Sequence, residues 1–388
     1  MSSQLSQKSH TLTTGLAMFS MLFGAGNIVF ALAIGQYAQD KNLYAIIGLL
    51  ITAVGVPFLG LVAMTLFNGD YRSFFDRIGK VPGFFVASII LGLIGPFGAI
   101  PRCLALSYAT SKPYLPEMSL PFFSVLACLF IFVLTYKRTS ILNLLGYFLT
   151  PLKLGSLLFI IVNGFLFSPE IPAAAHDELA VFIKGLTDGY QTMDLLGAFF
   201  FCSVVLDCLR KNIDVSNPAN YKRMIVVTLK ASCIGAALLA TIYIGFSYVA
   251  AAYSSSLMDV QPEELISNIA IQVLGPYAGL IVSFTVTMAC LTTAVALTTV
   301  FAEFIHKDLT KAKLSYPLAL LATLAITFAI STLNFTGIVA LLEPILVLCY
   351  PALIVLCLVN ILFKLYQFKP VKVPVMLMFG ASVIAYFI

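Results

Sequence analysis

The chain has 388 residues, of which 60% are hydrophobic and 10% are charged, and its mean hydropathy is +1.01. This composition is typical of a polytopic membrane protein, so the net charge of +5 does not point to a nucleic-acid partner. The three histidines fall outside the predicted spans and have no ligand spacing, so we expect neither a metalloenzyme nor another enzyme.

Hydrophobic runs of about 20 residues predict about eleven membrane-spanning helices. In chain order they cover 11–37, 42–67, 83–110, 119–136, 141–167, 187–209, 223–252, 267–303, 314–332, 336–363 and 371–388. Residues 1–10 are polar and are expected to form a cytoplasmic tail. The first run has no cleavage pattern and is expected to be retained as a span.

The distribution of basic residues predicts the orientation. If the N-terminus is cytoplasmic, most of the 22 Lys and Arg residues fall in inner connections, whereas the outer connections hold only Lys41, Lys112 and Lys184. This asymmetry follows the positive-inside rule and predicts a cytoplasmic N-terminus.

Spans one to five (11–167) and six to ten (187–363) form two halves of five, and 371–388 is an additional span. An odd number of crossings inverts the second half, as an inverted-repeat transporter requires. The first span of each half is interrupted, at Gly24–Asn27 and at Asp188–Asp194. Either interruption alone is equally well a kink with close helix packing, but a matched pair predicts a transporter binding site.

The chemistry of such a break follows from the helix dipoles. A half-helix that begins after Gly26 presents free N–H groups to an anion, and a half-helix that ends near Phe23 presents carbonyl groups to a cation. One break can therefore hold both ends of a zwitterion, or a carboxylate beside a metal ion. An amino acid fits this pattern.

Motifs spread over five spans resemble the branched-chain amino acid:cation symporter family. They are Gly15–Phe30, Gly95–Tyr108, Asp188–Leu196, Ala289–Leu297 and Leu341–Leu356. The resemblance implies an all-α integral membrane protein with a LeuT-like 5+5 inverted repeat whose helices 1 and 6 are broken. It also implies a multi-pass protein of the bacterial inner membrane that imports leucine, isoleucine, valine or possible analogues such as methionine by alternating access, with no cofactor besides the coupling ion.

The resemblance also implies the positions of the substrate and of a cation. Backbone groups at the first break would receive the carboxylate and carbonyl groups at the second would receive the ammonium, which assigns substrate binding to Gly24, Ala25, Gly26, Asn27, Tyr190, Gln191, Thr192 and Met193. A sodium ion would lie among the carbonyls of Ser20, Phe23 and Ala289 and the hydroxyls of Thr292 and Thr293. The alternative for the threonine pair is hydroxyls that bond back to the preceding helical turn.

The substrate's alkyl group is expected among apolar side chains near Phe23, Ile100 and Phe199. Charged residues within the spans are costly, and Arg102, Asp194 and Glu343 are expected to form a gating or charge network. Direct contact of Arg102 or Asp194 with the substrate is the alternative.

Lys153 lies within the fifth span, where the symporter family more often has an apolar residue. Its surroundings resemble the fifth span of proton-coupled or cation-independent amino acid transporters, in which a lysine ammonium replaces the sodium ion. The resemblance therefore leaves Na⁺ or H⁺ coupling open, with a proton-coupled or uncoupled exchanger as the alternative function. A lysine that snorkels to the inner membrane surface is an equally weighted interpretation.

The family usually has twelve spans, whereas this chain ends within the eleventh, at Phe379–Ile388. Because both five-span repeats are complete, we expect transport to be retained. The lipid bilayer and an apolar amino acid are the expected partners, and the sequence leaves the oligomeric state open.

Overall fold

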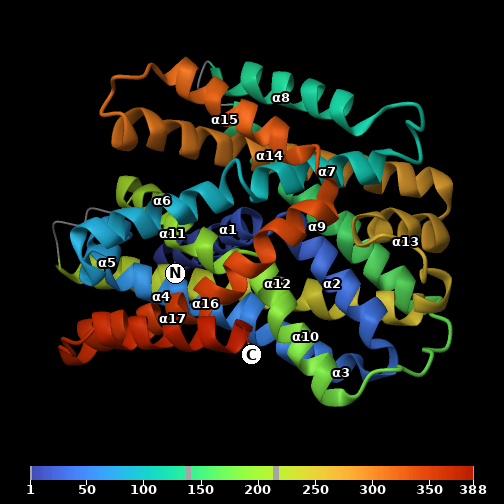
Figure 1. Ribbon diagram of the computed structural model, residues 1–388, viewed down its shortest axis with the longest axis horizontal. Helices are drawn as coiled ribbons and strands as arrows, with labels where there is room; N and C mark the ends of the chain where they lie inside the picture. The colour runs from blue at the N-terminus through green and yellow to red at the C-terminus, as the bar shows by residue number, and fades with distance from the viewer. Residues whose placement is uncertain (1, 137–140, 213–217, 388) are drawn as a thin grey trace.

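The computed structural model describes residues 2–136, 141–212 and 218–387 (Figure 1). Within these ranges the regular elements are all helices. A helix satisfies its backbone hydrogen bonds internally, as a segment surrounded by lipid must. Among the described residues, 6 helical stretches are long and apolar enough to cross a membrane, and shorter apolar helices accompany them. The all-α, multi-span architecture expected from the sequence is confirmed.

The helices follow one another in two sets. The first set is α1 (Ser2–Leu22), α2 (Ala25–Ala38), α3 (Asn42–Leu50), α4 (Val56–Leu66), α5 (Tyr71–Phe75), α6 (Lys80–Ile94), α7 (Ala99–Ser111), α8 (Leu120–Tyr136) and α9 (Ile141–Leu166). The second set is α10 (Glu178–Gln191), α11 (Asp194–Asn212), α12 (Pro218–Ala252), α13 (Leu265–Leu274), α14 (Pro276–Phe304), α15 (Tyr316–Ser331) and α16 (Asn334–Tyr366). The last helix, α17 (Lys372–Phe387), follows them.

Two of the spans are broken within the segments that the sequence singles out. Span 1 consists of α1 and α2, which are separated at Phe23 and Gly24. Span 6 consists of α10 and α11, which are separated at Thr192 and Met193, where Met193 has a φ of 60°. This left-handed conformation is uncommon for a residue with a side chain, and it ends the helix.

Two other boundaries differ from the prediction. The run 267–303, predicted as one span, contains α13 and α14 as separate helices, so that prediction is wrong. Gly275 has a φ of 82°, and the following Pro276 starts a new helix because it cannot donate a backbone N–H. Span 3, predicted as the continuous run 83–110, is also interrupted, at a turn over 95–98 between α6 and α7. Helix α1 begins at Ser2, so the expected N-terminal tail continues the first helix.

The two sets of helices interlock. Helix α3 packs on α10, α7 on α14, α4 on α11, and α12 on both α1 and α2 (Figure 1). Small residues allow the backbones to approach closely, since a Cβ atom at Gly185 would lie 2.1 Å from the carbonyl oxygen of Ala45. The interior therefore lies between the two sets, where the breaks in spans 1 and 6 also lie.

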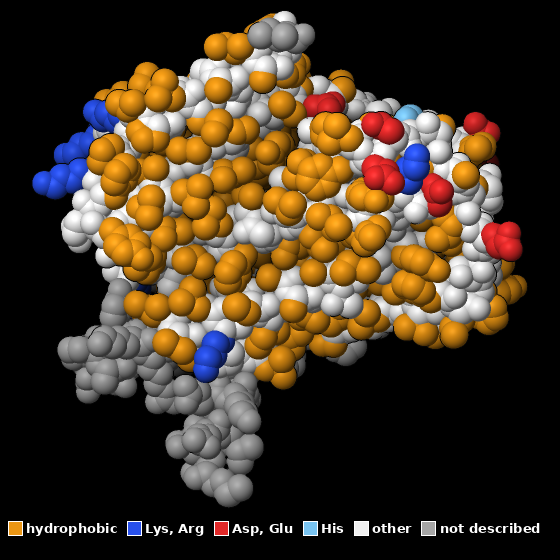
Figure 2. Space-filling view, turned by 90° about the horizontal axis from the view of Figure 1, so that it is seen from below, with side chains coloured by type: hydrophobic (Ala, Val, Ile, Leu, Met, Phe, Trp, Pro, Cys, Tyr) orange, Lys and Arg blue, Asp and Glu red, His pale blue; other side chains and the backbone are white. Residues whose placement is uncertain are grey.

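Charges separate to opposite ends of the molecule. In Figure 2, a group of Lys and Arg side chains lies at one end, Asp and Glu side chains gather at the other with a basic side chain among them, and hydrophobic side chains cover most of the surface between. We call the end formed by 67–80, 305–315 and 364–372 the basic end, and the end formed by 39–41, 168–178 and 254–264 the acidic end. The apolar belt between the ends is the surface expected to face lipid.

Candidate functional site

The two helix breaks touch each other at Gly26. A Cβ atom at this position would lie 3.3 Å from the carbonyl oxygen of Gln191 and 3.3 Å from the Cα atom of Thr192. These distances are shorter than ordinary carbon contacts, so the N-terminus of α2 approaches the end of α10 as closely as glycine allows. The residues predicted to bind the carboxylate and the ammonium are therefore adjacent in space.

The side chain of Asn27 connects both breaks. Its Oδ1 accepts a hydrogen bond of 2.7 Å from the backbone N–H of Gly24, and its Nδ2 donates one of 2.7 Å to Asp194 Oδ2. The hydroxyl of Tyr243 accepts a further hydrogen bond from Asn27 Nδ2 and donates one of 2.9 Å to the same carboxylate oxygen. All three side chains are buried. Asn27 and Asp194 thus hold the two breaks in register, with Tyr243 of α12 as a third partner.

Sequence reasoning missed Tyr243. It lies within the hydrophobic run 223–252, and nothing in its spacing distinguishes it from the other aromatic residues there. Its function depends on where α12 packs against the breaks, which is a property of the tertiary structure.

Lys153 of α9 reaches the first break. The side chain is 3% exposed, and its Nζ donates a hydrogen bond of 3.2 Å to the carbonyl oxygen of Phe23. The Nζ atom also lies 5.0 Å from the centroid of the Phe23 ring, within the range of a cation–π contact. Lys153 is therefore directed into the protein and does not snorkel. Its ammonium lies at the carbonyl end of α1, where a helix dipole favours a cation.

The hydroxyls of the adjacent threonine pair of α14 donate hydrogen bonds to the backbone of their own helix. The hydroxyls of Thr292 and Thr293 donate hydrogen bonds of 2.8 Å and 3.0 Å to the carbonyl oxygen of Ala289. This is the back-bonding that sequence reasoning kept as the alternative. A hydroxyl that donates a hydrogen bond keeps its lone pairs, so both oxygens can still coordinate a cation. Ser20, the remaining predicted ligand, is half-buried on α1.

Arg102 links span 3 to the second break. Its Nη1 donates a hydrogen bond of 2.6 Å to the carbonyl oxygen of Gln191, and its Nη2 donates one of 2.9 Å to Gln191 Oε1. Arg102 is 1% exposed and lies in α7, on the acidic-end side of the break in span 3. We call this pair of hydrogen bonds from Arg102 to Gln191 the clamp. It occupies one of the carbonyl groups predicted to receive the substrate ammonium.

The other members of the predicted charge network, Asp194 and Glu343, have different hydrogen-bonding surroundings from Arg102. Asp194 belongs to the Asn27 network, and Glu343 of α16 is exposed. Tyr190 packs its ring 4.8 Å from that of Tyr350, also on α16. Arg102, Asp194 and Glu343 therefore form no direct ion pair with one another among the described residues, although Arg102 and Asp194 border the same cavity.

A cavity of about 50 Å³ lies beside the breaks. Its walls are Met21, Leu22, Gly24, Ala25, Gly26, Asn27, Ile94, Ala99, Arg102, Cys103, Thr192, Met193, Asp194, Gly197, Phe201, Thr293 and Leu297. Apart from the breaks themselves, most of these residues belong to the halves of spans 1, 3, 6 and 8 nearer the basic end. This volume holds only a few water molecules and is well below the roughly 300 Å³ or more of typical ligand sites.

The apolar wall differs from the one expected. Phe23, Ile100 and Phe199 are buried but do not line the cavity, and the ring of Phe199 packs 5.2 Å from that of Phe74 in α5. Ile94, Phe201 and Leu297 supply apolar surface instead. The interruption of span 3 separates α6 from α7, and hydropathy alone does not predict such a break.

Comparison with known proteins gives matches over almost the whole chain. A family model described as "Branched-chain amino acid transport protein" matches residues 7–387. The chain is 30% identical over 376 residues to the branched-chain amino acid permease BrnQ of Bacillus subtilis (strain 168), which covers 93% of this chain and 83% of that protein. It is 26% identical over 395 residues to a putative branched-chain amino acid carrier protein of Staphylococcus aureus (strain USA300), covering 96% of this chain and 87% of the relative.

Solved structures share the fold. The inward-facing conformation of Mhp1 matches with a TM-score of 0.68 at 12% identity and covers 97% of this chain and 85% of that one. MhsT in complex with L-phenylalanine matches with a TM-score of 0.52 at 14% identity and covers 96% of this chain and 98% of that one. These neighbours establish a LeuT-like transporter fold, and the family match over almost the whole length establishes that the chain belongs to the branched-chain amino acid transport protein family.

Proposed function

We propose that this chain is a secondary transporter that imports branched-chain amino acids, or similar apolar amino acids such as methionine, by alternating access. Family membership and the permease relative support the substrate class. The observation that carries the proposal is the contact between the two breaks at Gly26. It puts the N–H end of α2 beside the carbonyl end of α10, where one zwitterion meets both.

The hydrogen bonds refine which backbone groups bind the substrate. Because Asn27 already accepts from the Gly24 N–H, we assign the carboxylate to the N–H groups of Ala25 and Gly26. Arg102 holds the Gln191 carbonyl, so we assign the ammonium to the carbonyl of Thr192, which lies 3.5 Å from the Cβ position of Gly26. Binding requires the cavity to widen, as expected when an alternating-access transporter changes conformation.

Uptake of labelled leucine into proteoliposomes tests this function. Saturable uptake supports a secondary transporter if an imposed Na⁺ or proton gradient raises the leucine concentration inside the vesicles above that outside. Competition by valine, isoleucine, methionine and alanine measures selectivity. An apolar pocket discriminates between substrates that differ by one methylene group by only about 1–3 kcal/mol. Absence of saturable, gradient-dependent uptake in folded protein would contradict the proposal.

A second candidate is proton-coupled or uncoupled exchange in which Lys153 supplies the cation at the first break. The hydrogen bond from Lys153 to the Phe23 carbonyl favours it, since Phe23 is one of the expected sodium ligands. A sodium ion in this position would be repelled by the ammonium group at close range. Leucine counterflow with no ion gradient, compared with uptake under separate Na⁺ and proton gradients, distinguishes the two modes.

We also propose that the protein lies in the bacterial plasma membrane with its basic end and N-terminus in the cytoplasm. The separation of charges between the two ends supports this orientation. Labelling of a cysteine introduced at Lys369, at the basic end, by a membrane-impermeant reagent tests it. The reagent is expected to react in inverted vesicles and not in intact cells, and the reverse pattern would contradict the orientation.

A further inference from the structure

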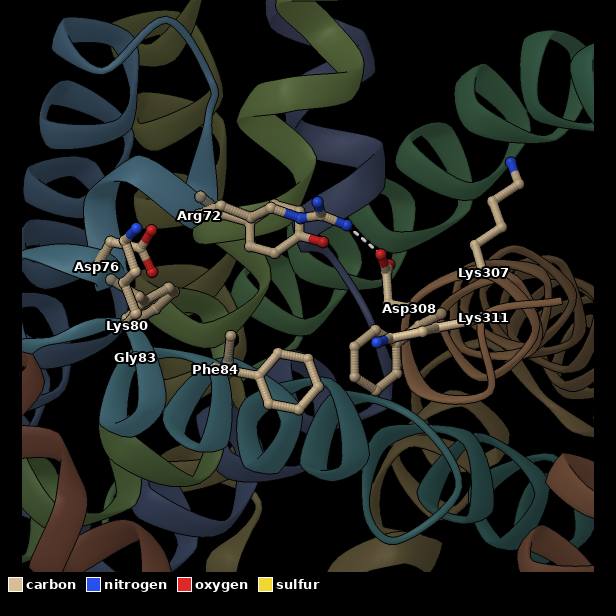
Figure 3. Close-up of a pocket in the computed structure, with 12 residues that line it drawn as sticks. Arg72, Asp76, Lys80, Gly83, Phe84, Lys307, Asp308 and Lys311 are labelled. Atoms are coloured by element: carbon tan, nitrogen blue, oxygen red, sulfur yellow. Dashed lines mark hydrogen bonds and ion pairs between the residues drawn. The ribbon is translucent and has the colours of Figure 1, made fainter. Parts of the chain in front are cut away.

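A second, larger pocket lies at the basic end, away from the helix breaks. It has a volume of about 370 Å³ and is bounded by α5, the start of α6, and the end of α14 with the turn that follows it (Figure 3). Its walls are Tyr71, Arg72, Phe75, Asp76, Lys80, Gly83, Phe84, Ala87, Phe304, Lys307, Asp308 and Lys311. It shares no residue with the cavity beside the breaks.

Positive charge exceeds negative charge around this pocket. Arg72 pairs with Asp308 across its rim, and Lys307 pairs with Glu303 at 3.6 Å. Within the part of the chain that the structure describes, Lys80 and Lys311 form no ion pair. In Figure 3, Lys311 points toward the phenyl rings of the pocket whereas Lys307 points away. The lining therefore holds Arg72, Lys80, Lys307 and Lys311 against the carboxylates of Asp76 and Asp308, so its net charge is positive, and the ammonium groups of Lys80 and Lys311 remain for an anion.

The remaining wall is apolar and continues into the lipid-facing surface. Phe75, Phe84, Ala87 and Phe304 line the pocket. Phe84 is 43% exposed, and the neighbouring Val81 and Phe85 of α6 are more exposed still. A ligand that suits this site carries a negative charge at the basic end and apolar chains along α6. A phospholipid has this arrangement.

We propose that this pocket binds the phosphate group of an anionic phospholipid, with its acyl chains against Phe84 and the exposed face of α6. Basic pockets between spans bind anionic headgroups in this way, and each Lys or Arg near the surface strengthens the attraction. The net positive charge selects an anionic lipid over a zwitterionic one. The apolar wall selects a lipid over a soluble phosphate, because the soluble ion leaves that wall uncovered.

The wall of the pocket packs against α11, the second half of the broken span 6. Tyr71, in its wall, packs its ring 5.0 Å from that of Phe200 in α11. The Arg72–Asp308 pair joins the same α5 segment to the turn after α14. A bound lipid therefore bridges α5 and α14 next to the basic-end half of span 6, and we expect it to stabilise this end of the protein.

Titration of the detergent-purified full chain with phosphatidylglycerol tests the proposal, with binding measured by native mass spectrometry and stability by the apparent Tm. We expect phosphatidylglycerol to bind and raise the Tm, and phosphatidylcholine to do neither at the same concentrations. The double variant Lys80→Gln/Lys311→Gln is expected to bind phosphatidylglycerol about 30-fold more weakly. Both lysines are exposed, so the substitutions preserve the fold.

Lys369→Gln is the matched control, because Lys369 is an exposed lysine of the basic end outside the pocket. It is expected to bind phosphatidylglycerol like the parent. Equal weakening in the control and the double variant would show a general surface charge effect and overturn the proposal. Equal stabilisation by glycerol 3-phosphate would show a site for soluble phosphates and would also overturn it. If the double variant does not fold, the two single variants give the same comparison.

Discussion

The ammonium nitrogen of Lys153 lies 3.2 Å from the carbonyl oxygen of Phe23, the first residue of the break in span 1. The chain thereby places a positive charge of its own at the carbonyl end of a half-helix. The substrate carboxylate is expected two residues further along the chain, at the N–H groups of α2. Lys153 is therefore positioned to affect both the conformation of the break and the ion that drives transport.

Replacing Lys153 with alanine is expected to reduce leucine uptake about 10- to 150-fold, because a hydrogen bond to a charged group contributes about 1.5–3 kcal/mol. If the lysine supplies the cation, the variant also gains stimulation by a Na⁺ gradient and loses stimulation by a proton gradient. Proteoliposome uptake under each gradient measures both effects.

Lys230→Ala is the control for this variant, since Lys230 is an exposed lysine of α12. It is expected to transport leucine like the parent under either gradient. Unchanged uptake and unchanged ion dependence in Lys153→Ala would rule out a role for Lys153 in coupling.

Gly26→Val is expected to abolish leucine binding. Even a single Cβ atom at this position would lie 3.3 Å from both Gln191 and Thr192, and the branched side chain adds two methyl groups where the breaks meet. The measurement is leucine binding by scintillation proximity with purified protein. The control is Gly155→Val, because a Cβ atom at Gly155 meets nothing within 4 Å. Normal binding by Gly26→Val would show that the contact between the breaks is not the site.

The sequence predicts the break in span 1 well, and the physical reason is local. Glycines and an asparagine within an apolar run oppose a continuous helix in lipid whatever the surrounding fold. The separation of α13 from α14 also has a local signal, the Gly275–Pro276 pair, but the apolar run on both sides concealed it. Glycine, asparagine and proline within an apolar run thus predict where a helix ends, whereas hydropathy alone does not.

The partners of the site residues could not be predicted in this way. Whether Lys153 reaches the interior or the membrane surface depends on how α9 is rotated, and that depends on packing. The same holds for Tyr243, whose hydroxyl meets Asp194 only because α12 crosses both halves of span 1. The family resemblance predicts which segments carry the site, whereas the tertiary structure determines the hydrogen bonds that their side chains form.

Asp194→Ala is expected to destabilise the protein more than Tyr243→Phe. The phenylalanine variant removes the two hydrogen bonds of the Tyr243 hydroxyl, each worth about 0.6–1.7 kcal/mol in a membrane protein, but it leaves Asn27 bonded to Asp194. The alanine variant leaves the donors of both Asn27 and Tyr243 buried without their carboxylate acceptor. The apparent Tm of each purified variant measures the difference. An equal or smaller decrease for Asp194→Ala would show that the carboxylate does not hold the network together.

Arg102→Lys is expected to loosen the acidic-end side of the site although it keeps the charge. A lysine cannot reproduce the paired hydrogen bonds that Arg102 donates to the Gln191 carbonyl and side chain, since these depend on the planar guanidinium group. We expect faster hydrogen–deuterium exchange in residues 186–193 and slower leucine uptake. Arg77→Lys serves as the control: Arg77 bonds Asn360 and carbonyl groups at the basic end, so its replacement leaves exchange in 186–193 unchanged. If Arg102→Lys also leaves that exchange unchanged, the clamp does not close the acidic-end side, and the Gln191 carbonyl becomes available as a substrate ligand.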